Sequence, residues 1–90
     1  MILRDDSILA RILSRITEGK IAIWLWRHPG WHDVQEITEA HPLLSEKRIY
    51  QVLKDMRSLN FIEVRKIGRK YEYKLSPLLF DELNKGIGSH

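Results

Sequence analysis

Basic side chains gather in the second half of this 90-residue chain. Residues 45–74 contain nine lysines and arginines against four acidic residues, whereas the remainder holds six basic and eight acidic residues. A basic surface of this kind attracts polyanions such as nucleic acids. An ordinary solvated helix face has a similar composition, so the charge alone leaves both interpretations open. The nine basic residues are Lys47, Arg48, Lys54, Arg57, Arg65, Lys66, Arg69, Lys70 and Lys74.

A second group of residues has the types that bind metals, namely three histidines close in sequence to two carboxylates. His32 and Glu36 are four residues apart and would share one face of a helix, a possible metal-ligand spacing. Asp33 and Glu36 also have the spacing of a capping box, and this interpretation is favoured, with His28 and His41 as turn residues. The chain has no cysteine, which excludes thiolate zinc sites and disulfides. We therefore expect no metal and no cofactor.

Catalytic patterns are absent from the sequence. There is no nucleophile with an assignable base, no phosphate-binding glycine loop and no convincing carboxylate pair. The adjacent Asp5 and Asp6 are better explained as the start of a helix. Trp24, Trp26 and Trp31 stand among apolar residues, which favours packing over stacking on single-stranded bases. The chain is therefore not expected to be an enzyme.

Length and composition indicate one small folded domain. The chain is 10.7 kDa, with 43% hydrophobic and 30% charged residues, which favours folding over disorder. Its longest apolar run, residues 21–26, is far shorter than the ~20 residues of a membrane span. The N-terminus is acidic where a signal peptide needs basic residues. We expect a cytoplasmic protein with a single domain over residues 1–85 and a flexible tail over residues 86–90.

Apolar periodicity predicts four helices before a change of pattern. The first, within residues 1–16, has Asp5 or Asp6 as its N-cap. Gly19 weakens the helical pattern, Thr17 could cap a new helix, and a second, mostly apolar helix is predicted over residues 20–28. A short helix begins at Asp33, and His41–Pro42 ends it. A fourth helix over residues 46–60 is capped by Ser45 and has one apolar stripe, made of Ile49, Val52, Leu53, Met56 and Leu59.

After residue 60 the period changes from that of a helix to that of a strand. Residues 61–67 and 70–75 predict two paired strands around Gly68. Ile62 and Val64 would face one side of this hairpin, and Tyr71 and Tyr73 would pack on the preceding helix. Ser76 and Pro77 then have the types of an N-cap and a first helical residue, which predicts a short helix over residues 77–85.

This order of elements resembles the winged helix-turn-helix regulators of the ArsR/MarR-like superfamily. The similarity covers residues 17–77. Residues 44–54 are similar to the recognition helix of that family, and residues 61–75 to its wing. The resemblance implies an α+β, mostly α fold, with a three-helix core and hairpin over residues 17–76 and extra N- and C-terminal helices. It also implies double-stranded DNA as the partner.

Two features depart from the family pattern. The turn before the recognition helix usually contains glycine, whereas residues 40–43 here are Ala, His, Pro and Leu. ArsR-like metal sensors use cysteines, and this chain has none. Thiolate metal sensing is therefore not implied for this chain.

A recognition helix lies in the major groove, so its exposed side chains would meet bases and phosphates. Lys47, Arg48, Tyr50 and Gln51 are expected to face base edges, because Arg and Lys pair with guanine and Gln with adenine. Lys54 and Arg57 would contact phosphates, as would Ser45 and nearby backbone amides at the helix start. The basic hairpin tip would follow the DNA backbone or enter the minor groove. Its residues are Lys66, Arg69 and Lys70.

Surplus apolar residues at the two ends of the chain suggest a homodimer formed by the N- and C-terminal helices. This surplus includes Trp24, Trp26, Leu79, Phe80 and Leu83; alternatively, these side chains fold back onto residues 20–28 of their own chain. The predicted function is a sequence-specific transcriptional regulator, in the form of a dimeric repressor. A protein-interaction module and a sequence-neutral nucleic-acid packaging protein are the alternatives, since fold does not fix function.

Overall fold

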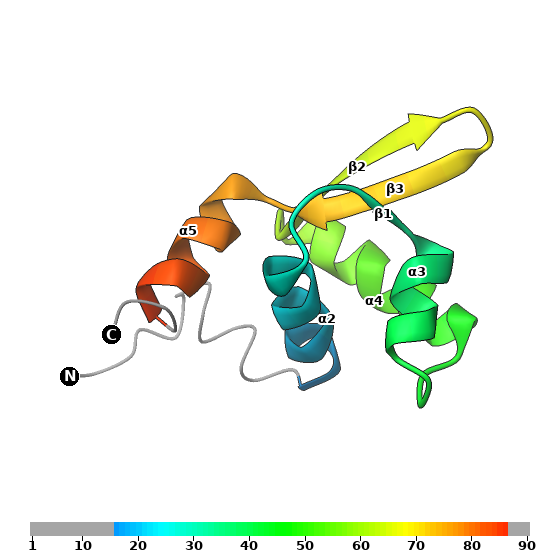
Figure 1. Cartoon of the computed structure of the whole chain (residues 1–90), viewed down its shortest axis with the longest axis horizontal. Helices are drawn as coiled ribbons and strands as arrows, with labels where there is room; N and C mark the ends of the chain where they lie inside the picture. Colours follow the sequence, from blue (N-terminus) through cyan, green and yellow to red (C-terminus); the bar gives the residue numbers. More distant parts are fainter. Residues whose placement is uncertain (1–15, 87–90) are drawn as a thin grey trace.

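The structure is a computed structural model that describes residues 16–86 (Figure 1). Within this range the chain forms four helices and three strands. The helices surround an apolar centre, and a β-hairpin extends past them on one side of the molecule (Figure 1). In chain order the elements are α2 (Ile16–Arg27), β1 (His32–Asp33), α3 (Val34–Ala40), α4 (Glu46–Ser58), β2 (Ile62–Ile67), β3 (Lys70–Leu75) and α5 (Pro77–Gly86).

Helix α2 corrects one detail of the sequence-based prediction. The helix is continuous from Ile16, so Thr17 lies inside it and does not cap a new helix, and no break occurs at Gly19. Gly19 is buried, as are Ile21 and Leu25 on the following turns. A glycine inside a helix costs only about 1 kcal/mol relative to alanine, and the packing of this apolar helix outweighs that cost.

Helix α3 begins with the predicted capping box. The Asp33 side chain accepts from the backbone N–H of Glu36, and the Glu36 side chain accepts from the backbone N–H of Asp33. At the other end His41 forms the C-cap, and its backbone N–H donates to the Thr38 carbonyl at 3.0 Å. His41 has a negative φ of −129°, so this turn into α4 has no need of the glycine that the family pattern would place there.

Helix α4 begins at the predicted cap and ends two residues earlier than predicted, at Ser58. Asn60 follows with a positive φ of 61°. The Phe61 N–H donates to the Met56 carbonyl and the Asn60 N–H to the Arg57 carbonyl, which is the hydrogen-bond pattern of a Schellman motif with asparagine in the left-handed position. This motif turns the chain directly from α4 into the hairpin.

Strands β2 and β3 form the predicted hairpin, and β1 adds a short third strand that the sequence analysis did not predict. The antiparallel sheet has the order β1–β3–β2, and His32 lies opposite Tyr73. Pairs that face each other across β2 and β3 share one side of the sheet. Ile62 with Leu75 and Val64 with Tyr73 are therefore on the inner side, toward α4, and this side is the more buried one.

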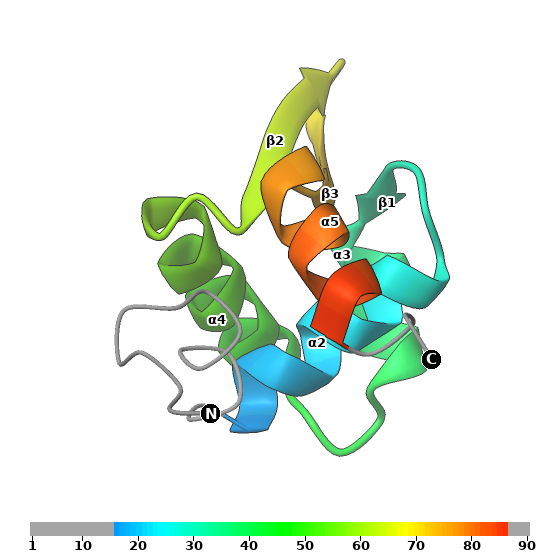
Figure 2. The ribbon, with the colours of Figure 1, turned by 90° about the vertical axis from the view of Figure 1, so that its left-hand side faces the viewer.

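Helix α5 is part of the core of its own chain. Ser76 caps it, with the hydroxyl accepting from the Leu79 N–H, and Leu79 and Leu83 are 0% and 1% exposed. The Trp26 indole N–H of α2 donates to the Asn84 side chain at 2.8 Å. Figure 2 views the molecule with α5 in front of α2. Leu79 and Leu83 are therefore not surplus apolar surface. The dimer prediction included both residues in that surplus, and this part of its basis was wrong.

Some predictions fall outside the described residues. The first helix and its caps at Asp5 or Asp6 belong to residues 1–15, and the predicted tail belongs to residues 87–90 except for its first residue, Gly86, which ends α5. Between residues 16 and 86, none of the helices has both the length and the apolar character that crossing a membrane requires.

Candidate nucleic-acid interface

Helix α4 separates its apolar and polar side chains onto opposite faces. Ile49, Val52, Leu53 and Met56 are at most 1% exposed and pack in the core. The opposite face is exposed and carries the predicted contact residues of this helix. The start of the helix is fixed by Ser45, whose hydroxyl accepts from the Arg48 N–H at 3.1 Å. The N-terminal turn therefore presents further backbone amides at its open end.

The exposed residues of α4 do not all face the same way. A helix turns by about 100° per residue, so Lys47, Gln51 and Lys54 form the centre of the exposed face. Arg48 flanks this centre on one side. Tyr50 and Arg57 flank it on the other side, where they line a groove against the hairpin. Of the six residues of this helix that were predicted to contact DNA, four thus lie on the open face, and Tyr50 and Arg57 lie where the helix meets the hairpin.

Lysines and arginines on α4 keep their charge free of internal partners. Across residues 16–86, none of the ion pairs includes Lys47, Arg48, Lys54 or Arg57. An unpaired cation at an exposed position retains its full attraction for an anion in solution. This face of α4 is therefore available for a polyanion.

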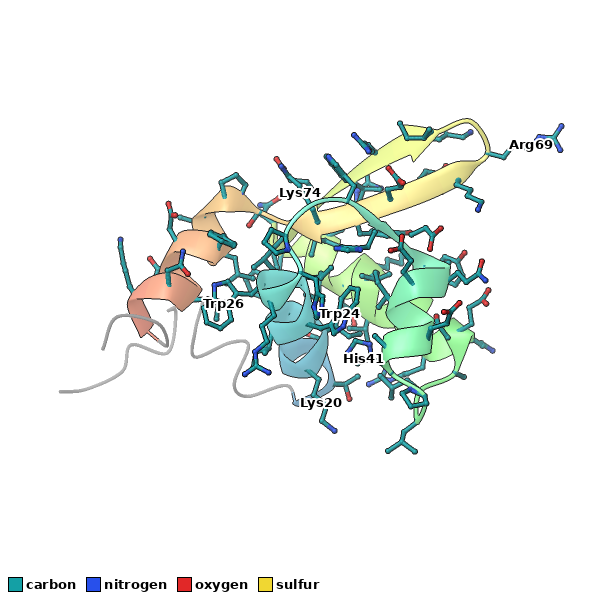
Figure 3. All side chains as sticks on the ribbon, in the orientation of Figure 1. Lys20, Trp24, Trp26, His41, Arg69 and Lys74 are labelled. Atoms are coloured by element: carbon teal, nitrogen blue, oxygen red, sulfur yellow. The ribbon has the colours of Figure 1, made fainter. Side chains whose placement is uncertain are left out.

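The predicted basic cluster at the hairpin tip is divided among three directions. Gly68 and Arg69 form a two-residue loop between β2 and β3, and Gly68 has a φ of 61° that suits glycine at the first turn position. Arg69 points away from the body of the molecule (Figure 3). Lys66 pairs with Tyr71 on the inner side of the sheet, and its ammonium lies 5.7 Å from that ring. Lys70 is on the outer side.

On the outer side of the sheet, the basic residues have acidic or aromatic partners. Arg65 bonds Glu72 at 2.7 Å and Lys74 lies 3.6 Å from Glu63. Both cations also lie over the Trp31 ring, with distances to its centroid of 4.4 Å for Arg65 and 5.2 Å for Lys74. Figure 3 shows Lys74 on this side of the molecule. These internal contacts separate Arg65 and Lys74 from the free cations of α4.

Lys70 belongs to the same outer side. Its ammonium lies 3.9 Å from a carboxylate oxygen of Asp33 on β1, and 71% of its side chain is exposed. A pair this long and this exposed contributes little, so Lys70 retains access to another anion.

Tyr50 of α4 meets two tyrosines of β3. Tyr50 and Tyr71 are 46% and 48% exposed, whereas Tyr73 is 8% exposed and belongs to the core. Burial raises the pKa of the Tyr73 phenol above its ordinary value of 10.0, and the nearby Tyr50 and Tyr71 act in the same direction, while Arg57 acts against it. Tyr73 is therefore a neutral phenol at physiological pH. The predicted packing of the hairpin tyrosines on α4 is thus seen at Tyr73.

The histidines considered as metal ligands surround Trp24 instead. His28 stacks on the indole at 4.5 Å, and His32 and His41 meet it edge-on at 4.8 and 6.0 Å. Figure 3 shows Trp24 and His41 next to each other between α2 and α3. His32 lies 3.2 Å from Glu36. In the part of the chain that the structure describes, no group of three or more His, Cys, Asp or Glu side chains is arranged to hold a metal ion.

The arrangement of helices α2–α4 and the hairpin is shared with solved structures of transcriptional regulators. The reduced form of the regulator YodB from B. subtilis superposes with a TM-score of 0.77 at 22% identity, covering 98% of this chain and 86% of that chain. A regulator described as a member of the MarR family, from Porphyromonas gingivalis W83, superposes with a TM-score of 0.75 at 19% identity, covering 98% and 89%. This chain has a winged helix-turn-helix fold.

A third similar structure contains DNA. It is TubR bound to 24 bp of tubC, from Bacillus thuringiensis serovar israelensis pBtoxis. The TM-score is 0.65 at 18% identity, covering 98% of this chain and 96% of that chain. No protein-family model and no curated protein sequence matches the chain. The predicted winged helix-turn-helix fold is therefore confirmed by shape, with the hairpin β2–β3 as the wing.

Sequence reasoning missed two features of this surface. Trp31 was assigned to packing, and its position between Arg65 and Lys74 was not foreseen. The short β1 strand, which brings Asp33 beside Lys70, was also missed, because two residues are too few for an alternating pattern. The available signal was the alternation of β3, where Glu72 and Lys74 had to face some partner on the outer side.

Proposed function

We propose that this protein is a sequence-specific double-stranded DNA-binding transcriptional regulator that acts as a dimeric repressor. The observation that carries this proposal is the exposed face of α4, where Lys47, Arg48 and Lys54 form no ion pair within residues 16–86. An α-helix fits the major groove, and one whose inner face is fully buried can present only its outer face there. The similar TubR structure, which has bound DNA, supports DNA as the partner.

In this proposal the side chains of α4 divide their tasks by position. Lys47, Arg48 and Gln51 lie in the first two turns and read base edges. Lys and Arg donate to the acceptor atoms of guanine, and Gln pairs with the donor and the acceptor of adenine. Lys54 and Arg57 lie further along the helix and contact phosphates. Ser45 is already engaged as a cap, so it acts by holding the backbone amides of the first turn toward a phosphate.

The hairpin tip provides a second contact to DNA. Arg69 extends furthest from the body of the protein (Figure 3), and it enters the minor groove or follows the backbone. Lys66 and Lys70 flank it on opposite sides of the sheet and contact phosphates. Basic residues at a hairpin tip also discourage edge-to-edge pairing, and only the DNA-contacting role predicts that Arg69→Ala lowers the affinity for DNA.

The proposal still includes a dimer, although α5 offers a second copy less apolar surface than the sequence predicted. Leu78 is 57% exposed on α5, and Phe80 is only partly buried, so α5 still presents apolar surface to a second copy. The other predicted contribution comes from the N-terminal helix, outside the described residues. A two-fold dimer places two recognition helices about 34–36 Å apart in successive major grooves. Sedimentation equilibrium at tens of micromolar checks this point, and a monomer there contradicts it.

Selection of bound duplexes from a random DNA pool tests the function. A dimeric regulator of this kind enriches a palindromic consensus with half-sites one helical turn apart. A sequence-neutral packaging protein binds with steep salt dependence and enriches no consensus. A protein-interaction module retains no duplex. The last two outcomes each contradict the proposal and identify the alternative that replaces it.

A further inference from the structure

A groove runs between α4 and the inner side of the hairpin. It has a volume of about 370 Å³, and its base is closed by Leu53 and Val64 together with the buried ring of Tyr73. Its walls carry Tyr50, Tyr71 and the two cations Lys54 and Arg57. The groove therefore combines aromatic surface with positive charge.

The two wall tyrosines are unusual in how much surface they leave open. Tyr50 and Tyr71 are each nearly half exposed, although a large aromatic ring gains most from burial. Both also line a neighbouring hollow that Arg69 and Lys70 border. The exposed aromatic surface thus continues from the side of α4 to the tip of the hairpin, with cations on both sides of it.

We propose that this groove binds the sugar–phosphate backbone of one DNA strand, with Tyr50 and Tyr71 as neutral hydrogen-bond donors to phosphate. The proposal rests on the proposed function, since α4 must lie in the major groove for the bordering strand to reach the groove. A phosphodiester backbone alternates an anion with an apolar sugar. Lys54 and Arg57 suit the anion, and the two aromatic rings suit the sugar.

Neutral and charged donors leave different signatures in the salt dependence of binding. A cation that neutralises one phosphate adds about 0.9 to the slope of log affinity against log salt, because counterions are released. A phenol hydroxyl donates to the same phosphate without changing the charge. Removal of a tyrosine hydroxyl should therefore lower the affinity equally at every salt concentration.

The test uses the full chain, the selected duplex and a NaCl titration followed by fluorescence anisotropy. Tyr50→Phe and Tyr71→Phe are each expected to weaken binding by about three- to tenfold with an unchanged slope. Lys54→Gln is expected to reduce the slope by about 0.9. Lys74→Gln is the matched control for Lys54→Gln, because Lys74 is paired with Glu63 on the outer side of the hairpin, away from the groove, and this variant should keep the affinity and the slope of the unmodified chain.

A second measurement locates the contact on the DNA. Each phosphate is replaced in turn by an uncharged methylphosphonate, and the Tyr71→Phe effect is measured again. At the contacted phosphate the two changes should be strongly non-additive, whereas they should add elsewhere. Additivity at every position, wild-type affinity of both Phe variants, or a reduced salt slope in either Phe variant overturns the inference. A chain that selects no duplex overturns the proposed function along with it.

Discussion

Two basic surfaces of this molecule use their charge differently. On α4, the cations Lys47, Arg48 and Lys54 are exposed and have no ion pair within the described residues. On the outer side of the hairpin, Arg65 and Lys74 contact Glu72 and Glu63 and lie over Trp31. Arg65 and Lys74 thus contact other side chains of the protein, whereas the α4 cations remain available to a partner.

The difference shows that a count of basic residues overstates the surface available to DNA. An ion pair cancels most of the field that an exposed cation would otherwise exert on an anion within a Debye length. Of the nine basic residues in the stretch 45–74, Arg65 and Lys74 are neutralised in this way. The attractive surface is therefore the face of α4 together with the hairpin tip at Lys66, Arg69 and Lys70, and the four paired side chains of the hairpin shaft carry no net charge.

The largest expected effect is on DNA affinity, which should differ between a variant of the α4 face and a variant of the hairpin. Arg48→Ala should weaken binding to the selected duplex by about 1–3 kcal/mol and relax the preference at one base pair, because a bidentate contact to guanine is lost. Arg65→Ala is the matched control and should leave affinity nearly unchanged. Competition binding with single-base variants of the duplex measures both. Equal losses of affinity in the two variants would show that Arg65 contacts DNA despite its ion pair with Glu72.

The reverse experiment concerns folding. Arg65→Ala should destabilise the protein by about 1 kcal/mol, since it removes a surface ion pair and a cation–π contact with Trp31. Arg48→Ala should change the unfolding free energy by less than about 0.5 kcal/mol, as expected for an exposed residue without partners. Urea unfolding gives both values. A double-mutant cycle with Glu72→Ala then isolates the ion pair, and a coupling energy of zero would remove it as a source of stability.

The smallest effect concerns pH and the tyrosines where α4 meets the hairpin. Because the folded-state pKa of Tyr73 is raised, its contribution to stability is fully present below the unfolded-state pKa, near 10. It is lost as the pH rises through the folded-state pKa, because the unfolded chain gives up the phenol proton first.

Tyr73→Phe should therefore flatten the loss of stability at alkaline pH and leave the stability near pH 7 almost unchanged. Urea unfolding at a series of pH values above neutrality is the measurement, and Tyr71→Phe, whose ring is half exposed, serves as the comparison. An identical alkaline decline in wild type and Tyr73→Phe would assign that decline to other groups.

Much of the fold could be predicted because local patterns agreed with the tertiary structure. The capping box at Asp33 and the caps at Ser45 and Ser76 were all predicted correctly from residue types. The apolar stripe of α4 was also correct, because one face of a helix follows from spacing alone. The prediction that Thr17 caps a new helix was wrong, since residue propensity could not show that the turn of α2 at Gly19 is buried.

The candidate interface was only partly predictable, for a physical reason. The sequence by itself determined which residues of α4 are core and which are solvent-facing, because helical spacing fixes the face that a side chain occupies. Which cations are paired depends on residues that are near in space and separate along the chain, such as Arg65 with Trp31 and Lys70 with Asp33. Only the tertiary structure decided those contacts, and with them the groove between Tyr50 and Tyr71, because strand pairing and the turn at Asn60 set how the hairpin lies against α4.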